Sequence, residues 1–262
     1  MEIIVLVKQV PDTETMVQIA EDGATILTQD IKWVMNPYDE FAVEEALRMR
    51  DTHGGTVTIM SLGPQKTAET IRTALAMGAD RGVHINDPAA EGSDALGAAR
   101  ILTAALKDIP HDVVIAGQRA VDDDCYQVGA AVAEFLNIPQ ISMVVKQQIE
   151  NGKITCEQTV DGGIAVVEAP LPVLLTTQRG LNEPRYASLP GIMKAKKKPL
   201  EVRTLADLGI DPATVGNGAR KVTIKSLKFP PKRKPVRMVQ GGDVRSKAAE
   251  LVRILHEEYE AI

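Results

Sequence analysis

Short apolar segments alternate with amphipathic segments over the first 177 residues of the chain. Apolar runs rich in β-branched residues predict buried strands over 2–8, 56–62, 82–85, 112–116 and 172–177. Helical periodicity between them predicts helices over 37–53, 67–77, 94–106 and 125–136. Strands that alternate with helices are typical of an α/β fold, in which helices cover both faces of a mostly parallel sheet through right-handed crossovers.

Two further groups of strands are predicted to pair in antiparallel fashion. Segments 141–149, 154–160 and 164–168 are separated by Asn151-Gly152 and by Gly162-Gly163, which are turn sequences. We expect this meander to extend the sheet. Near the N-terminus, segments 16–20 and 25–28 flank Asp22-Gly23 and predict a hairpin.

The first predicted helix has an apolar face and a charged face. Asn36 can cap it and Pro37 suits its first position. The residues expected to face the core are Phe41, Ala42, Ala46 and Met49. The residues expected to lie largely in solvent are Glu40, Glu44, Glu45 and Arg48.

Charge divides the chain in two. Residues 1–182 carry 13 basic and 26 acidic side chains, a net charge of −13, whereas residues 183–262 carry 17 basic and 9 acidic side chains, a net charge of +8. After residue 182 apolar periodicity is weak until a helical pattern over 244–259. We therefore predict an α/β domain over 1–182 and an extended region over 183–262 that contacts a partner.

Composition excludes several classes of protein. No apolar run approaches the roughly 20 residues of a membrane-spanning helix, and no signal peptide is visible, so a cytoplasmic protein is expected. Two cysteines provide no disulfide framework, and no Cys or His lies at zinc-ligand spacing. Eight aromatic residues leave little for stacking on bases, so nucleic acid is a poor candidate ligand.

Ligands of open parallel sheets bind beyond the carboxyl ends of the strands. Candidate segments there are 8–13, 36–39, 61–64 and 117–128. None carries a G-x-G-x-x-G, P-loop or G-x-S-x-G motif, so a standard dinucleotide site, a triphosphate site and a hydrolase elbow are disfavoured.

The segment from Gly117 to Gly129 is the most informative, because a helix is predicted to start near Asp124. The N–H groups at that start could bind a phosphate, or Asp122–Asp124 could simply cap the helix. Capping is the favoured interpretation from composition alone. A metal site lacks supporting ligands, and Cys125 as a nucleophile lacks a nearby base. No catalytic residue is therefore predicted.

Four segments together resemble the β subunit of electron transfer flavoprotein. They are residues 34–46 (VMNPYDEFAVEEA), 69–82 (ETIRTALAMGADRG), 120–129 (AVDDDCYQVG) and 181–198 (LNEPRYASLPGIMKAKKK). The resemblance runs along the whole chain. It implies a three-layer α/β sandwich of the adenine-nucleotide-hydrolase-like kind, with a C-terminal arm that embraces the α subunit.

The resemblance also implies a function. Members of this family are αβ heterodimers that carry electrons from dehydrogenases, such as the acyl-CoA dehydrogenases of fatty acid oxidation, to a membrane quinone oxidoreductase. FAD belongs mainly to the α subunit, and the β subunit holds AMP in a structural role. The AMP-binding positions carried over by motif are Leu6, Asn36, Pro37, Tyr38, Asp39, Leu62, Gly117, Gln118, Arg119, Ala120, Val121, Asp122, Asp123, Asp124, Cys125, Tyr126, Gln127 and Val128. Tyr38 also matches a position whose ring approaches the flavin, and Thr13 stands where the family has a second aromatic residue.

Residues 182–198, here called the recognition segment, match the family's loop that recognises the partner dehydrogenase. Leu189 matches the leucine that anchors the partner, and ordinary loop packing is the alternative role for this residue. The expected partner contacts are Pro184, Arg185, Tyr186, Leu189, Pro190, Ile192, Met193 and Lys194.

Two other functions stay open. An electron-bifurcating branch of the family carries a second FAD in the β subunit and meets NADH. That branch typically has Gly where this chain has Asp123, which favours the AMP-binding branch here. The second alternative is a stand-alone nucleotide-binding module similar to a universal stress protein.

Overall fold

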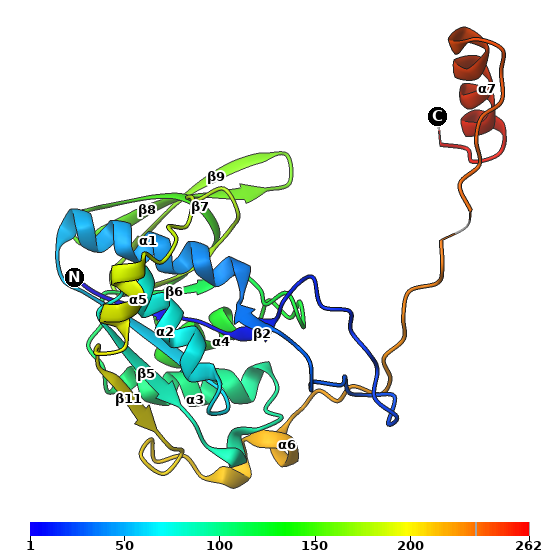
Figure 1. Cartoon of the computed structure of the whole chain (residues 1–262). Coiled ribbons are helices and arrows are strands. Elements are labelled where there is room, and N and C mark those ends of the chain that lie inside the picture. Colours follow the sequence, from blue (N-terminus) through cyan, green and yellow to red (C-terminus); the bar gives the residue numbers. More distant parts are fainter. Residues whose placement is uncertain (234, 262) are drawn as a thin grey trace.

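The computed structural model describes residues 1–233 and 235–261. Its main feature is a nine-stranded sheet with the order β11-β5-β4-β1-β6-β10-β7-β8-β9 (Figure 1). The strands of this sheet are β1 (Glu2–Leu6), β4 (Thr56–Leu62), β5 (Arg81–Ile85), β6 (Val113–Gly117), β7 (Gln140–Glu150), β8 (Lys153–Val160), β9 (Gly163–Pro170), β10 (Val173–Thr177) and β11 (Leu200–Arg203). Neighbours from β11 to β7 pair in parallel, and β7, β8 and β9 form the antiparallel meander.

Helices cover both faces of the sheet, so the predicted three-layer α/β fold is confirmed. The helices are α1 (Pro37–His53), α2 (Thr67–Met77), α3 (Ala95–Lys107), α4 (Val128–Leu136), α5 (Leu189–Ala195), α6 (Gly216–Ala219) and α7 (Val244–Glu257). Short 3₁₀ turns lie at Pro88–Ala90 and Pro212–Thr214. Side chains of β1 show the division: Ile3 and Val5 belong to the core beneath α1 and α2, whereas Ile4 and Leu6 belong to the core beneath α3 and α4.

Several sequence predictions about single elements are wrong. The hairpin predicted over 16–28 is reduced to one bridge between Ile19 and Ile26. Strand β2 (Gln9–Pro11) pairs instead with β3 (Trp33–Met35) in a separate two-stranded sheet. Helix α4 begins at Val128 rather than near Asp124. Glu44 and Glu45, expected in solvent, are buried.

The region after residue 182 contains more regular structure than its sequence pattern predicts. Helix α5 packs on α2, and β11 adds an edge strand to the sheet beside β5. Leu205 and Val215 from this region are buried in the core beneath α3. The boundary between the two predicted regions at residue 182 stays a prediction, although part of the second region folds against the first.

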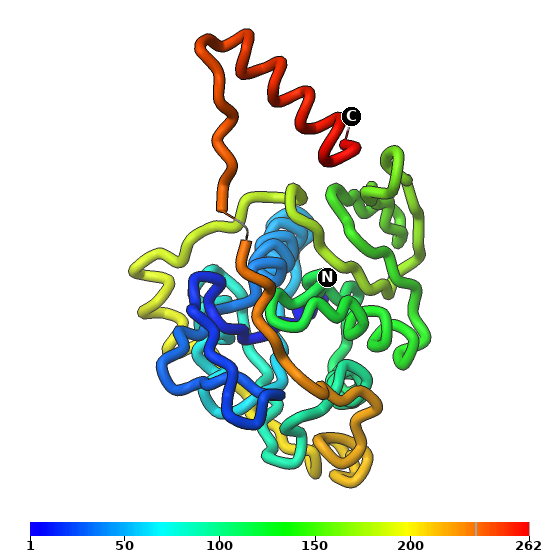
Figure 2. Tube along the Cα trace, turned by 90° about the vertical axis from the view of Figure 1, so that its right-hand side faces the viewer, coloured from blue at the N-terminus to red at the C-terminus, as the bar shows by residue number. Residues whose placement is uncertain are grey.

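Beyond α6 the chain runs as an extended arm to α7, which stands away from the sheet (Figures 1 and 2). The arm passes the loop after β2, where the Leu227 N–H donates to the carbonyl oxygen of Gly23 at 2.7 Å. Apolar side chains of α7 such as Val244 and Val252 are exposed. Of the helices in the described ranges, none combines the length and apolar character needed to cross a bilayer.

The close packing of α2 and β11 on β5 gives a stability prediction. A Cβ atom at Gly82 of β5 would lie 2.5 Å from Cγ2 of Ile71 and 2.9 Å from Cδ1 of Leu200. We expect Gly82→Ala to lower the free energy of unfolding by about 1–3 kcal/mol, because the added methyl group overfills the core. Gly163→Ala in β9 is the matched control, since a Cβ atom there meets nothing within 4 Å. Equal urea midpoints for the two variants would contradict this packing.

Candidate functional site

A cleft opens where β1, β4 and β6 end, between the starts of α3 and α4. Its walls come from several elements that are distant in sequence. The lining residues are Leu6, Val7, Lys8, Asp39, Leu62, Ser93, Asp94, Ala95, Ala98, Leu102, Ala116, Gly117, Gln118, Arg119, Ala120, Asp123, Cys125, Tyr126, Gln127, Val128 and Gly129. The cleft therefore lies at the edge of the sheet where ligands of parallel α/β folds bind.

Twelve of the eighteen positions expected to bind the nucleotide line this cleft. The other six are Asn36, Pro37, Tyr38, Val121, Asp122 and Asp124. Of these, Asn36 is hydrogen-bonded to Val121, and Tyr38 is hydrogen-bonded to the lining residue Arg119. Lys8 lies in the candidate segment 8–13 but is not among the eighteen positions, and the start of α3, Ser93–Ala95, was in no candidate segment. The start of α3 could have been found from the sequence, because Asp94 begins a predicted helix that follows a predicted buried strand.

Asp39 joins three of the segments around the cleft. Its Oδ2 accepts a hydrogen bond from the Lys8 N–H at 2.7 Å, and its Oδ1 accepts from Asn36 Nδ2 at 2.8 Å and from the Gly117 N–H at 3.2 Å. Burial raises the pKa of Asp39 to about 7, although these donors favour the carboxylate. Asp39 thus fixes the ends of β1 and β6 to the first turn of α1.

Asn36 does not cap α1 with its side chain, contrary to the sequence prediction. It binds instead the loop of residues 118–127, here called the cleft loop. Asn36 Nδ2 donates to the carbonyl oxygen of Arg119 at 2.8 Å, and Asn36 Oδ1 accepts from the Val121 N–H at 3.2 Å. The start of α1 therefore holds the cleft loop against the sheet.

Close packing at the end of β6 requires glycine. A Cβ atom at Gly117 would lie 2.2 Å from Asp39 Oδ1 and 2.8 Å from Cβ of Tyr38. Any side chain at this position would push the first turn of α1 away from the strand. Gly117 thus allows the hydrogen bond between the strand and Asp39.

The three aspartates of the cleft loop are paired with two cations, Lys8 just after β1 and Arg119 of the loop itself. Lys8 Nζ lies 2.8 Å from Asp122 Oδ1 and 2.9 Å from Asp123 Oδ2. Burial lowers the pKa of Lys8, but the two carboxylates outweigh it and hold the pKa above its usual value. Asp124 receives two hydrogen bonds from Arg119 Nη1, at 2.6 and 2.7 Å. The carboxylates therefore repel an anion in the cleft less than their sequence suggests.

Arg119 lies between two aromatic rings. Its guanidinium is 5.0 Å from the ring centroid of Tyr38 and 5.6 Å from that of Tyr126, and Nη2 donates to the Tyr38 hydroxyl at 2.8 Å. Asp124 and Tyr126 both have a left-handed backbone, with φ of 53° and 59°. Non-glycine residues seldom adopt this conformation, and they concentrate at sites that bind ligands.

The capping role favoured for Asp122–Asp124 is wrong. Gln127 occupies the N-cap position of the nine-residue helix α4, and no side chain in the described part of the protein caps it. The first N–H groups of α4, at the edge of the cleft, are thus free to bind an anion. Gln118 Oε1 and Arg119 Nε are also buried without a hydrogen-bond partner among the described residues. Unpaired buried polar atoms beside an uncapped helix start are the features that a polar, anionic ligand would satisfy.

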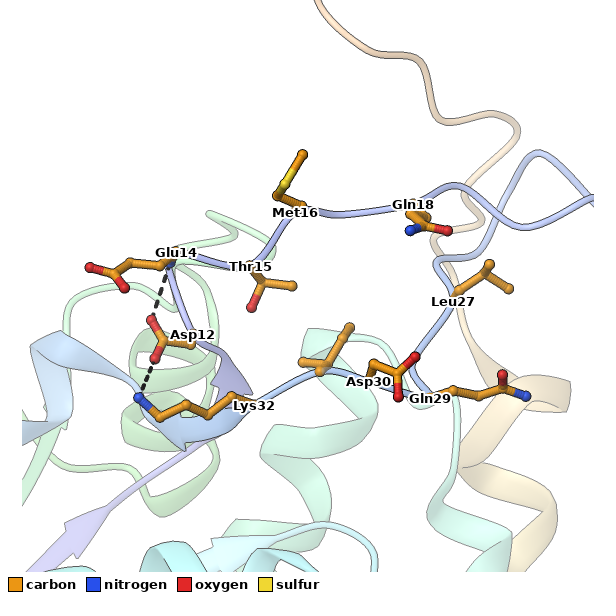
Figure 3. Close-up of a pocket in the computed structure, with 10 residues that line it drawn as sticks. Asp12, Glu14, Thr15, Met16, Gln18, Leu27, Gln29, Asp30 and Lys32 are labelled. Carbon is orange, nitrogen blue, oxygen red and sulfur yellow. Dashed lines mark hydrogen bonds and ion pairs between the residues drawn. The ribbon is translucent and has the colours of Figure 1, made fainter.

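A second hollow lies on the loop between β2 and β3 (Figure 3). Ten residues line it: Asp12, Glu14, Thr15, Met16, Gln18, Leu27, Gln29, Asp30, Ile31 and Lys32. Lys32 Nζ pairs with Asp12 Oδ2 at 2.7 Å and closes one end. Met16 is 91% exposed, so this apolar side chain is not packed within the chain.

The recognition segment projects from the α1 and α2 face of the sheet. Ser188 caps α5, since its Oγ accepts from the Gly191 N–H at 3.1 Å. Leu189 is 79% and Met193 72% exposed, so neither residue is packed into a core of this chain. Tyr186, just before the helix, is 98% exposed.

The C-terminal ends of α5 and α2 are held by reciprocal contacts. Arg72 of α2 donates to the carbonyl oxygens of Ala195 and Lys198, at 2.6 and 2.7 Å. In return, Lys198 Nζ donates to the carbonyl oxygens of Leu75 and Ala79. A helix of only seven residues is unstable alone, so these contacts account for its presence.

The raised pKa of Asp39 gives a pH prediction. Because the native pKa lies above that of an unfolded aspartate, ionisation of Asp39 lowers stability as the pH rises from about 4 to about 7. Asn at this position cannot ionise. We therefore expect the stability of the wild type relative to Asp39→Asn to fall between pH 4 and pH 8, by up to about 4 kcal/mol.

Urea unfolding at several pH values measures this difference. Asp161→Asn in the exposed turn between β8 and β9 is the control. The stability difference between wild type and this variant should change little with pH. A difference between wild type and Asp39→Asn that is constant with pH would contradict the raised pKa.

Comparison with known proteins agrees with this geometry. The family model of the electron transfer flavoprotein domain matches residues 23–208. The chain is 38% identical over 268 residues to electron transfer flavoprotein subunit beta of Bacillus subtilis, covering 100% of both chains. It is 40% identical to the protein of that name from Bos taurus, over 96% of this chain and 98% of the bovine one. It is 39% identical to the Homo sapiens protein of that name, over 97% of this chain and 99% of the human one.

The parallel α/β sheet and the matches along the whole chain lead to one conclusion. The chain belongs to the electron transfer flavoprotein family and is similar over its full length to the β subunits of that family.

Proposed function

We propose that this chain is the β subunit of a heterodimeric electron transfer flavoprotein of the AMP-binding branch. It pairs with an α subunit, holds AMP in the cleft, helps to shape the FAD site of the α subunit and docks dehydrogenases. The observation that carries the AMP assignment is the uncapped start of α4 beside the unpaired atoms Gln118 Oε1 and Arg119 Nε.

The residues of the cleft fit a mononucleotide. The N–H groups at the start of α4 suit a phosphate, and Gln118 Oε1 suits an N–H donor. Apolar side chains of Leu6, Leu62 and Leu102 provide a surface for a base. The role of AMP here is structural, since it would join the cleft loop, α4 and the strand ends.

FAD, when bound by the α subunit, supplies the capacity to accept and return electrons. Tyr38 is the residue of this chain proposed to face it, held in place by Arg119 Nη2. Thr13 stands between Asp12 and Glu14, which both line the second hollow, and it occupies the position where the family has a second aromatic ring. We expect this contact to be weaker in this chain.

Docking is assigned to the recognition segment, with Leu189 as the anchor. An exposed apolar side chain on a fixed helix can enter a pocket of a partner, and the lysines around it can steer the encounter. Lys194, Lys196 and Lys197 form no ion pair with the residues that the structure describes. The proposed electron donors are acyl-CoA dehydrogenases or related enzymes, and the proposed acceptor is a membrane quinone oxidoreductase. The proposed location of the complex is the cytoplasm.

This chain has no proposed substrate chemistry of its own. The electron-bifurcating alternative needs room in the β subunit for a second FAD. Asp123 lines the cleft and pairs with Lys8 at 2.9 Å, and its Oδ1 accepts from the Cys125 N–H at 3.1 Å. Glycine at this position would remove both contacts and widen the cleft, so Asp123 supports the AMP-binding branch.

Nucleotide content tests this proposal directly. The heterodimer, purified and denatured, should release one AMP and one FAD, measured by chromatography. Two FAD and no AMP would instead support the bifurcating alternative.

Gln118 gives a variant for the same assay. We expect Gln118→Leu to weaken AMP binding about tenfold while leaving FAD content unchanged, because a buried acceptor for the ligand is lost. Gln140→Leu, on the exposed start of β7, is the control. AMP retention equal to that of wild type would exclude Gln118 from the site.

Leu189 tests docking. We expect Leu189→Ala to raise the KM of the dehydrogenase for the flavoprotein about ten- to hundredfold, the effect of losing roughly 1–3 kcal/mol at a buried anchor. FAD and AMP content should stay unchanged. Val202→Ala, an exposed apolar residue of β11, is the control. Steady-state kinetics with an acyl-CoA dehydrogenase measures the effect, and an unchanged KM would defeat the anchor assignment.

A further inference from the structure

Helix α1 buries two adjacent carboxylates that its sequence pattern places in solvent. Glu44 is 3% and Glu45 5% exposed. Burial of a carboxylate is costly unless donors replace its water. The hydrogen-bond donors to these two carboxylates therefore identify the segments of the chain that α1 holds in place.

Glu44 binds the backbone and the side chain of Arg185. Its Oε2 accepts from Arg185 Nε at 2.7 Å and from the Arg185 N–H at 3.2 Å, and its Oε1 accepts from Arg185 Nη2 at 3.2 Å. Arg48 Nε, one turn along α1, donates to Oε1 at 2.8 Å. Burial raises the pKa of Glu44, but these donors outweigh it and hold the pKa below its usual value.

Glu45 binds a neighbour of Arg185. Its Oε2 accepts from Asn182 Nδ2 at 2.9 Å, and its Oε1 accepts from Gln147 Nε2 of β7 at 2.8 Å. Asn182 Nδ2 also donates to the carbonyl oxygen of Phe41 at 3.0 Å. All donors to Glu45 are neutral amides, so its geometry depends on their orientation.

Residues 182–185 are the first part of the recognition segment, directly before the exposed side chains of Tyr186 and Leu189. The far end of the segment is held by Arg72 and Lys198. Between these two ends α5 packs on α2, but the side chains of Tyr186 and Leu189 are exposed. The position of Leu189 thus depends on the packing of α5 on α2 and on the hydrogen bonds at the two ends of the segment.

We propose that Glu44 and Glu45 form a clasp, with Asn182 and Arg185, that positions the recognition segment for docking. Glu44 and Glu45 are positioning residues and do not touch the partner. Arg185 acts through Glu44 rather than by direct contact with the dehydrogenase. This inference rests on the docking function proposed above.

The test uses the heterodimer with bound nucleotides and two variants of α1. Glu44→Gln removes the nearer of the two carboxylates paired with Arg185, at 2.7 Å against 3.5 Å for Asp51. Glu45→Gln turns an amide donor towards the amide of Asn182 or Gln147. We expect each variant to raise the KM of the dehydrogenase for the flavoprotein about tenfold, with FAD content and kcat unchanged. Glu40→Gln on the same helix is the matched control, because Glu40 makes no side-chain hydrogen bond within the described ranges.

Hydrogen exchange gives a second readout that needs no partner. The amides of residues 186–195 should exchange about ten times faster in Glu44→Gln than in the control, because the segment is no longer fixed at its start. Arg185→Gln removes the same contact from the other side. If Arg185 acts through Glu44, the double variant should show no larger KM than either single variant.

The outcomes separate the clasp from the docking function. Unchanged exchange in both Glu44→Gln and Arg185→Gln overturns the clasp. An unchanged KM in these variants, together with a raised KM in Leu189→Ala, also overturns the clasp while docking stands. If Leu189→Ala leaves the KM unchanged, docking fails, and the exchange rates alone decide whether the clasp exists.

Discussion

The burial of three carboxylates on one helix organises this molecule. Asp39, Glu44 and Glu45 lie on α1, and each must find donors to replace water. Asp39 finds them at the ends of β1 and β6, and the two glutamates find them at the start of the recognition segment. Since α1 is a continuous helix of 17 residues, it fixes the cleft and the recognition segment relative to each other.

The acidic and basic parts of the chain also occupy different parts of the structure. The acidic part of the chain contains the cleft loop, whose three aspartates are paired with Lys8 and Arg119. This pairing reduces the repulsion that the carboxylates would exert on an anion near the start of α4. The basic part contains Lys194, Lys196 and Lys197 of the recognition segment and the lysines of the described arm, which are exposed. The acidic part of the chain thus contains the cleft, and the basic part contains the exposed side chains of α5 and the arm.

The sequence predicted the layers of the fold well, because strands buried on both faces are continuous apolar runs and Gly54 and Gly78 end helices. It predicted the position of the cleft, because the ends of parallel strands converge at one edge. Short elements such as α5 and β11 were missed, since their stability comes from tertiary contacts with α2 and β5 rather than from local pattern.

The errors at the site have a common physical cause. Glu44 and Glu45 fit the pattern of a solvated helix face, and their donors Asn182 and Arg185 lie far along the chain. The aspartates before α4 fit the pattern of a helix cap, but Lys8 of the N-terminal segment binds two of them. The local sequence pattern contains no information about a hydrogen-bond or ion-pair partner more than a hundred residues away. The burial of these charged side chains therefore could not be predicted from the sequence.

The most direct measurement is an experimental structure of the heterodimer with its bound nucleotides. We predict a single mononucleotide in the cleft, with its phosphate on the N–H groups at the start of α4, Asp123 still paired with Lys8, and the recognition segment held by Glu44. A dinucleotide that extends past Asp123, or a cleft closed by the α subunit with no nucleotide, would contradict this prediction.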